Sequence, residues 1–210
     1  MCVCICFFFS LYIVFLILKT ALFIVMNGFA SLTSSMAQSN IIQISNQQKK
    51  VAITYSSAES KLAAEILYSY LEKSLPNTFE IKDKNITKSD AQIILEIQKN
   101  NKELKDQEFI LKSNSQDISL LATNLKSLKY AVYTLLEKWE FRKFTATVSY
   151  LPKPDAFIFP KNFYQKYQPT FAYRTLLYPD SYDQAFREWH KLDWFNDDFG
   201  LWGHTFDRLV

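Results

Sequence analysis

Two amphipathic helices with several strands between them constrain the fold of this chain most strongly. Residues 51–55 form an apolar run typical of a short buried strand. Ser56 and Glu59 then provide a capping box for a helix that ends at Pro76. A second helical pattern extends from about 125 to 139. The apolar stretches between the helices, separated by turns rich in Asn, Asp and Lys, are 79–82, 91–97, 108–112 and 118–123.

This order of elements predicts an α/β domain over residues 50–150, in which an α+β sheet is covered on one side by two helices. Each helix has a recognisable apolar face. On the first helix the face consists of Leu62, Ala63, Ile66, Leu67, Tyr70 and Leu71. On the second helix it consists of Leu128, Val132, Leu135, Leu136 and Trp139.

The stretch after this domain has a different composition. Residues 151–169 contain four prolines, which disfavour helices and central strands, so we expect a connector that runs extended across the surface. Beyond it, residues 171–176 read as a strand, 181–192 as a helix and 200–206 as a second strand. Residues 170–210 therefore predict the first βαβ unit of an incomplete (β/α)8 barrel, a fold that takes roughly 250 residues when complete.

Residues 1–37 look like a targeting segment. A long apolar run is followed by Ser35-Met36-Ala37, which matches the small-x-small pattern before a signal-peptidase cut. No positive charge precedes the run, and its length approaches that of a membrane span, so an uncleaved anchor is the alternative. Both readings predict a protein that is secreted, periplasmic or at the cell surface, with membrane contact only through this segment.

Composition excludes several classes of partner and cofactor. The net charge is +3, but the lysines are spread along the chain and form no stripe that tracks a phosphate backbone, so nucleic acid is excluded as a partner. The three cysteines lie within the first six residues, and the chain has three glycines, which leaves no downstream disulfide and no glycine-rich phosphate loop. The His and Asp residues between 190 and 204 match no zinc-ligand spacing, and the acids read as a solvated loop. We predict no metal and no cofactor.

Aromatic residues are concentrated between 157 and 206. Such side chains either fill cores and interfaces or stack on sugar rings, and the pattern alone leaves both roles open. Trp202 is included here as a candidate for substrate binding.

Two further side chains come at the expected C-terminal ends of the barrel strands, where ligands of this fold bind. Arg174 has a planar fork that suits a carboxylate or sugar hydroxyls, and His204 has a side chain that moves protons near neutral pH. A contact that ties the barrel to the preceding domain is the alternative for Arg174, and a hydrogen-bonded core position is the alternative for His204. No catalytic residue is assigned, because Glu188, Asp193 and the other nearby acids have no evident partner at a strand end.

Several of these segments resemble known proteins. Phe171-Ala172-Tyr173-Arg174 and Trp202-Gly203-His204-Thr205-Phe206 resemble the barrel start in a family of uncharacterised bacterial secreted proteins similar to glycoside hydrolases. Residues 127–137 and 141–144 resemble the last helix and following strand of the non-catalytic N-terminal domain of α-glucuronidases and β-hexosaminidases. Where that pattern commonly has glycine before the strand, this chain has Glu140.

The resemblance implies an N-terminal accessory domain and barrel start of a secreted carbohydrate-active enzyme that acts on a polysaccharide or oligosaccharide. The catalytic residues would lie in later barrel strands, so we expect this fragment to be inactive. The alternative hypothesis is a non-catalytic surface protein that binds carbohydrate, or acts as a scaffold, through its aromatic segment.

The targeting segment generates the first prediction. Because Ser35-Met36-Ala37 satisfies the cleavage rule, mass spectrometry of the exported protein is expected to find Gln38 as the first residue. A membrane-bound product that retains Met1 would instead establish the uncleaved anchor.

Overall fold

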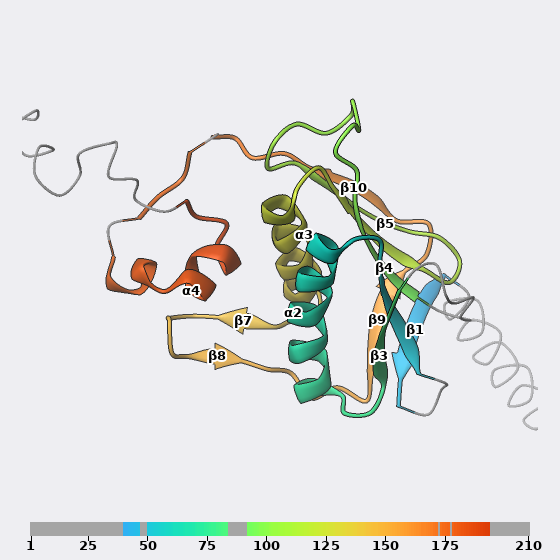
Figure 1. The fold of residues 1–210 in the computed structure, drawn as a ribbon. Helices are drawn as coiled ribbons and strands as arrows, with labels where there is room; N and C mark the ends of the chain where they lie inside the picture. Colours follow the sequence, from blue (N-terminus) through green and yellow to red (C-terminus); the bar gives the residue numbers. More distant parts are fainter. Residues whose placement is uncertain (1–39, 47–49, 84–91, 172, 177, 194–210) are drawn as a thin grey trace, which may run out of the picture. The chain divides into compact units, whose positions relative to one another are not determined.

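The computed structural model describes residues 40–46, 50–83, 92–171, 173–176 and 178–193. Their centre is a six-stranded mixed sheet in the order β10-β5-β6-β4-β2-β3 (Figure 1). The parallel strands are β2 (Val51–Tyr55), β3 (Phe79–Asp83), β4 (Gln92–Ile97) and β6 (Ile118–Ala122). The antiparallel strands are β5 (Phe109–Ser113) and β10 (Tyr164–Tyr167). The predicted mixed α/β class is confirmed.

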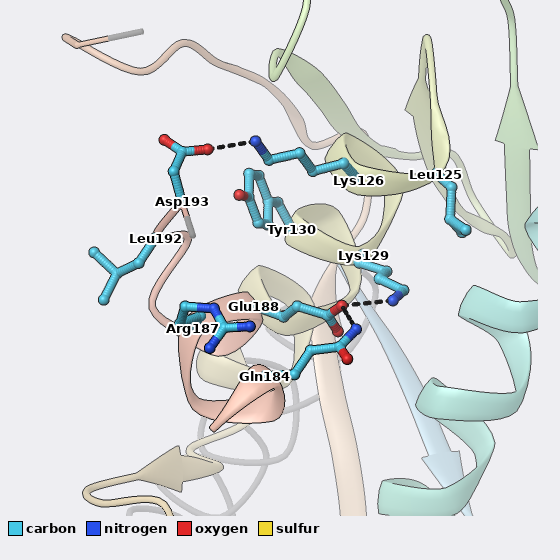
Figure 2. Close-up of a pocket in the computed structure, with 9 residues that line it drawn as sticks. All are labelled: Leu125, Lys126, Lys129, Tyr130, Gln184, Arg187, Glu188, Leu192 and Asp193. Carbon is cyan, nitrogen blue, oxygen red and sulfur yellow. Dashed lines mark hydrogen bonds and ion pairs between the residues drawn. The ribbon is translucent and has the colours of Figure 1, made fainter. Parts of the chain in front are cut away.

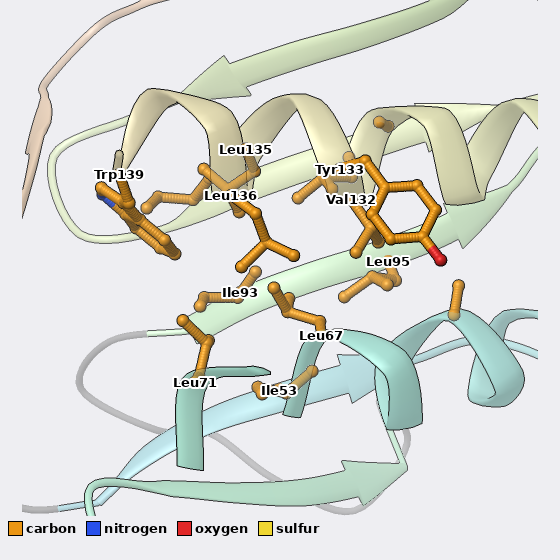
Figure 3. Packing of buried hydrophobic residues seen from close by; sticks show 14 of the residues in the cluster. Ile53, Leu67, Leu71, Ile93, Leu95, Val132, Tyr133, Leu135, Leu136 and Trp139 are labelled. Atoms are coloured by element: carbon orange, nitrogen blue, oxygen red, sulfur yellow. The ribbon is translucent and has the colours of Figure 1, made fainter. Parts of the chain in front are cut away.

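Two long helices cover one face of this sheet. Helix α2 (Ala58–Ser74) contacts β2, β3 and β4, whereas α3 (Leu125–Lys138) contacts β4, β5 and β6. Both helices also contact each other, and their apolar side chains interdigitate with Ile53, Ile93 and Leu95 of the sheet (Figure 3). These three residues are fully buried, so each contributes about 1.5–3 kcal/mol of burial free energy.

Helix α2 differs in detail from its prediction. Its N-cap is Ser57, one residue later than expected, and the capping box is completed by the hydroxyl of Ser60, which accepts from the Ser57 amide at 2.8 Å. Leu62 is half exposed, because the buried face turns toward Ala63, Ala64, Leu67 and Leu71. A serine at the third helical position replaces the glutamate of the usual box, since its shorter side chain still reaches the cap amide.

Helix α3 is buried on nearly all sides. Every residue from 130 to 136 is buried, although the sequence pattern placed only part of this run on an apolar face. A helix that is hydrophobic around its whole circumference requires cover on more than one side. The sheet and α2 supply part of that cover, and a third element has to supply the rest.

The proline-rich stretch takes a different path from the expected surface connector. It contains β9 (Ala156–Pro160), which pairs with β1 (Ile41–Ser45), and β10, which forms the edge of the main sheet beside β5. Phe157 and Phe159 are buried against the core, and Phe157 lies 4.8 Å from Trp139 between ring centroids. Proline is tolerated in a sheet at edge strands and at strand ends. Pro160 is the last residue of β9, and β10 is an edge strand, so the prolines of this stretch do not prevent pairing. The division of the chain into domains stays a prediction.

The expected barrel start is not confirmed. Residues 171 and 173–176 adopt no strand, and the expected helix of 181–192 is a 3-10 turn, η1 (Pro179–Tyr182), followed by the short α4 (Gln184–Trp189). A hairpin of β7 (Arg142–Lys143) and β8 (Ser149–Tyr150) completes the elements. The expected targeting segment and the second barrel strand lie outside the described residues. Within the part that is described, no helix is both long and apolar enough to cross a membrane.

Helix α3 ends in a left-handed turn at a residue that is not glycine. Glu140 has φ 67°, and its amide donates to the Glu137 carbonyl at 3.1 Å. The amide of Phe141 donates to the Leu136 carbonyl at 3.1 Å, which completes a Schellman motif. Glycine is the usual residue at this position, since a β-carbon makes the left-handed region costly. Glu140 therefore occupies a position at which glycine is the more favourable residue.

This turn generates a stability prediction. Replacing Glu140→Gly is expected to raise the free energy of unfolding by about 1 kcal/mol, because it removes the β-carbon strain. In a domain of this size that corresponds to an increase in melting temperature of about 3 °C. Circular dichroism melts measure the change.

Glu140→Ala is the matched control, because it removes the same charge and keeps the β-carbon. An equal increase in melting temperature for Glu140→Ala would attribute the effect to the carboxylate and contradict the conformational explanation.

Candidate functional site

A pocket of the described region lies between α3 and α4. It has a volume of about 470 Å3 and is lined by Leu125, Lys126, Lys129, Tyr130, Gln184, Arg187, Glu188, Leu192 and Asp193 (Figure 2). Helix α4 covers the outer side of α3, where Trp189 packs on Tyr133 with 5.2 Å between ring centroids. With six residues against fourteen, α4 is too short to follow α3 to its N-terminus. The pocket occupies the length of α3 that α4 leaves uncovered.

One ion pair forms a wall of this pocket. Lys129 Nζ lies 2.6 Å from Glu188 Oε1, which also accepts from Gln184 Nε2 at 2.8 Å. The hydroxyl of Tyr133 donates to Glu188 Oε2 over a longer distance of 3.4 Å. Burial, and then the charge of Glu188, raise the pKa of the Tyr133 hydroxyl. Glu188 is therefore held by α3 as an ion-paired anion.

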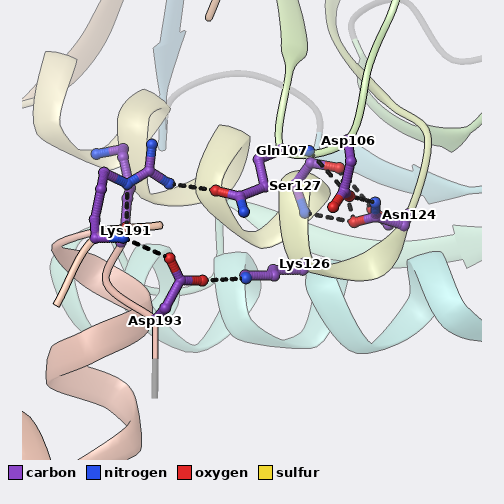
Figure 4. A network of polar contacts seen from close by, with 8 residues as sticks. Asp106, Gln107, Asn124, Lys126, Ser127, Lys191 and Asp193 are labelled. Carbon is purple, nitrogen blue, oxygen red and sulfur yellow. Dashed lines mark hydrogen bonds and ion pairs between the residues drawn. The ribbon is translucent and has the colours of Figure 1, made fainter. Parts of the chain in front are cut away.

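A second ion pair, Lys126 with Asp193, joins the start of α3 to the end of the α4 segment (Figure 4). Asp193 is 8% exposed, and its Oδ2 accepts from the Arg174 amide at 2.8 Å. The Asp193 amide donates in return to the Arg174 carbonyl at 2.6 Å. Burial by itself lowers the pKa of Lys126, but the hydrogen bond to Asp193 and nearby negative charge outweigh burial, so the pKa lies above its usual value. The expectation that Asp193 belongs to a solvated loop is wrong, because this pairing buries it.

Arg174 lies at the junction of these segments. Its Nε donates to the Lys191 carbonyl at 2.9 Å and its guanidinium donates to Gln107 Oε1 at 2.7 Å. The guanidinium carbon lies 5.8 Å from the centre of the Tyr130 ring, within cation–π range. Arg174 also lines a smaller pocket of about 110 Å3 next to Gln107. Through these contacts Arg174 joins the Lys191 segment to α3 and to Gln107, which precedes β5. They favour the alternative given for Arg174 in the sequence analysis, a contact that ties its segment to the preceding domain.

The predicted substrate-binding set is only partly placed. Arg174 lies beside Tyr130 and Asp193, whereas His204 and Trp202 fall outside the described residues. The pocket is made instead by residues to which sequence reasoning gave no role, among them Lys126, Lys129 and Gln184. One signal was available: Lys126, Lys129 and Tyr133 share a face of α3 at helical spacing, opposite the face assigned to the core.

The described residues present little that resembles catalytic or metal chemistry. They contain no cluster of three or more His, Cys, Asp or Glu side chains that could hold a metal ion. Within these ranges His190 is the only histidine, and its Nε2 lies 2.9 Å from the Lys143 carbonyl, which ties α4 to the β7–β8 hairpin. Glu188 and Asp193 are each engaged by a lysine. The arrangement joins the two helices and leaves between them a cavity lined by both charged and apolar side chains.

The aromatic segment divides into two sets. Phe157, Phe159, Phe186 and Trp189 are buried. Tyr164, Phe171, Tyr178 and Tyr182 are exposed, from 46% for Tyr182 to 68% for Phe171. Core packing and surface exposure therefore both occur within one stretch of sequence.

Comparison with known proteins finds similarity among solved structures alone. No family model matches the chain, and no curated protein matches it. A GH20 exo-β-N-acetylglucosaminidase from Vibrio harveyi in complex with N-acetylglucosamine aligns with 64% of this chain and 18% of its own, at 19% identity and a TM-score of 0.43. A mutant β-hexosaminidase from Streptomyces plicatus in complex with its product aligns with 64% of this chain and 24% of its own, at 14% identity and a TM-score of 0.46.

A third similar structure is a GH115 4-O-methyl-α-glucuronidase with specificity for decorated arabinogalactans. It aligns with 63% of this chain and 19% of its own, at 17% identity and a TM-score of 0.45. The structural neighbours are thus glycoside hydrolases at low identity, and this chain spans less than a quarter of the length of each.

The Lys126–Asp193 pair generates a prediction with a pH dependence. Asp193→Asn keeps an oxygen for the Arg174 amide but removes the charge that faces Lys126, and is expected to cost about 1 kcal/mol of unfolding free energy. Because the native pKa of Lys126 lies above its usual value of 10.5, the pair stabilises the fold below that pH and loses its effect as pH rises through the native pKa. Urea unfolding followed by tryptophan fluorescence is expected to show the gap between wild type and variant closing at alkaline pH.

The matched control is Asp155→Asn, which removes an exposed carboxylate just before β9. A loss of stability in Asp193→Asn that persists unchanged at alkaline pH would contradict the ion-pair explanation.

Proposed function

We propose that this chain comprises the non-catalytic N-terminal domain, and the beginning of the following domain, of a secreted glycoside-hydrolase-like enzyme that acts on polysaccharides or oligosaccharides. The resemblance of residues 127–144 and 202–206 to such proteins supports this function. The Schellman turn at Glu140 supports the first half of that resemblance, because it provides a physical reason for glycine at the equivalent position.

The observation that carries the non-catalytic assignment is the pairing of each carboxylate at the α3–α4 pocket with a lysine of α3. Glu188 accepts from Lys129 and Gln184, and Asp193 accepts from Lys126 and from the Arg174 amide. Glycoside hydrolysis generally uses two carboxyl groups placed on either side of the glycosidic bond, one of which exchanges a proton with the substrate. In this pocket the acids instead stabilise the packing of α4 on α3.

The same proposal assigns substrate contact to later residues. Arg174, His204 and Trp202 are proposed to belong to the sugar pocket of the complete enzyme, with Arg174 also fastening the two segments together. Residues 1–37 are proposed to direct export, and membrane contact is confined to them.

A second candidate function is a surface carbohydrate-binding protein. It is favoured by the exposure of Tyr178 and Tyr182 on either side of the η1 turn, with exposed fractions of 53% and 46%. The turn is held against the β7–β8 hairpin, because Asp180 Oδ1 accepts from the Ala146 amide at 2.8 Å. Exposed aromatic faces on a fixed turn are the kind of surface on which sugar rings stack.

The two candidates are separated by assaying the purified chain in two ways. On a panel of polysaccharides, a non-catalytic domain is expected to release no reducing sugar above the buffer control. On a glycan array, the accessory-domain function predicts no binding that depends on Tyr178 and Tyr182. The surface-binding function predicts saturable binding that Tyr178→Ala and Tyr182→Ala together abolish.

Tyr164→Ala is the matched control for the array, because it removes an exposed aromatic from β10, away from η1. Release of reducing sugar by the purified chain, in proportion to its concentration, would overturn the non-catalytic assignment.

A further inference from the structure

We infer that the α3–α4 pocket is a binding site for one neutral mono- or disaccharide unit. The inference rests on the proposed function, since it names a ligand class for the described part of a carbohydrate-active protein. It goes beyond that function because it places a sugar site between α3 and residues 184–193, apart from Arg174, His204 and Trp202. Three properties of the pocket carry it: its two ion pairs, its unused hydrogen-bonding capacity and its apolar wall.

The existing ion pairs disfavour an ionic ligand. The two lysines at the pocket face the two carboxylates, Lys126 with Asp193 and Lys129 with Glu188. Arg187 is a third cation of the lining, and its guanidinium donates to the Ser181 carbonyl at 2.7 Å and to the Tyr182 carbonyl at 2.9 Å. An anion or a cation would have to compete with one of these pairs and leave a partly buried charge without its partner. A neutral ligand leaves both pairs intact.

The same pairs retain hydrogen-bonding capacity that a polyhydroxylated ligand requires. An ammonium group has three N–H donors, and Lys129 uses one of them on Glu188. A carboxylate has about four acceptor positions, and Glu188 Oε2 is occupied only by the 3.4 Å contact with Tyr133. Gln184 adds an amide carbonyl, since its Nε2 is the atom that donates to Glu188. Donors and acceptors thus lie close together where Lys129, Glu188 and Gln184 meet (Figure 2).

Apolar groups complete the lining. Leu125 comes from the start of α3, Leu192 comes from the segment after α4, and the Tyr130 side chain lies between them (Figure 2). Pyranose rings present C–H faces as well as hydroxyl edges, so a site for them combines apolar or aromatic surface with a few polar groups. The volume of about 470 Å3 falls in the range of small-molecule pockets, at its smaller end.

The geometry also predicts a consequence for stability. The pocket is lined on one side by α3 and on the other by α4 and Leu192, so a ligand adds a bridge to the ion pairs and aromatic contacts that already join these elements. A ligand that binds only when α4 is in place is expected to raise the melting temperature as its concentration rises.

The test uses the whole purified chain and NMR titration with glucose, galactose, mannose, xylose, N-acetylglucosamine, cellobiose and xylobiose, each to about 50 mM. Glucuronic acid is the charged counterpart. At least one neutral sugar is expected to saturate and to bind about tenfold more tightly than glucuronic acid. Gln184→Leu and Glu188→Gln are each expected to weaken that binding by about tenfold or more.

Gln165→Leu is the matched control, because it replaces an exposed glutamine on β10, outside the pocket. Melting curves identify any variant that fails to fold, and Gln184, an exposed residue, provides the test if Glu188→Gln does not fold. Lost sugar binding in Gln184→Leu at an unchanged melting temperature supports the site.

Three outcomes overturn it. The first is no saturable binding of any neutral sugar, and the second is tighter binding of glucuronic acid. The third is neutral-sugar binding that survives both pocket variants and disappears on Tyr178→Ala with Tyr182→Ala, which rejects this pocket but supports the surface-binding function. Hydrolysis by the purified chain is a separate result, since it rejects the non-catalytic assignment without bearing on the pocket.

Discussion

The burial of residues 130–136 of α3 is the constraint on which the rest of the structure depends. The helix faces the sheet through residues such as Leu128 and Leu135, and its opposite side carries Tyr130 and Tyr133, which are equally buried. Desolvating such rings is favourable only if other side chains replace the water. Helix α4 supplies that replacement through Trp189, which packs near both Tyr70 and Tyr133. Trp189 of α4 is thereby part of the same core.

The ion pairs at the α3–α4 pocket follow from the same need to cover the outer side of α3. Near the N-terminus of α3, the contacts with the α4 segment are ion pairs instead of aromatic packing. Lys129 and Lys126 form these pairs and hold the α4 segment beside α3. Two lysines on one turn of a helix repel each other unless carboxylates face them, so each needs the partner that the α4 segment provides. The pocket lies where the contacts between α3 and the α4 segment change from apolar to polar.

The sequence predicted the parts of this fold that have a regular period. Strands β2 to β6 and both long helices lie close to their predicted positions, because each buries one face against the same core. The proline-rich strands were missed, since pairing between β9 and β1 depends on a partner far away in the sequence rather than on local pattern. Asp193 was assigned to solvent for the same reason: its partners, Lys126 and the Arg174 amide, are brought together only by the tertiary structure.

The pairing of β1 with β9 also has a consequence for how the protein is made. Strand β1 is the first described element, and its partner arrives after both long helices and most of the main sheet. A growing chain on the ribosome therefore carries β1 with its hydrogen-bonding edge unmatched while the intervening elements emerge. Closing so long a loop costs chain entropy that local contacts do not recover, and non-local pairings of this kind slow folding. The late Phe157 and Phe159, which enter the core with β9, link completion of that core to the emergence of the proline-rich stretch.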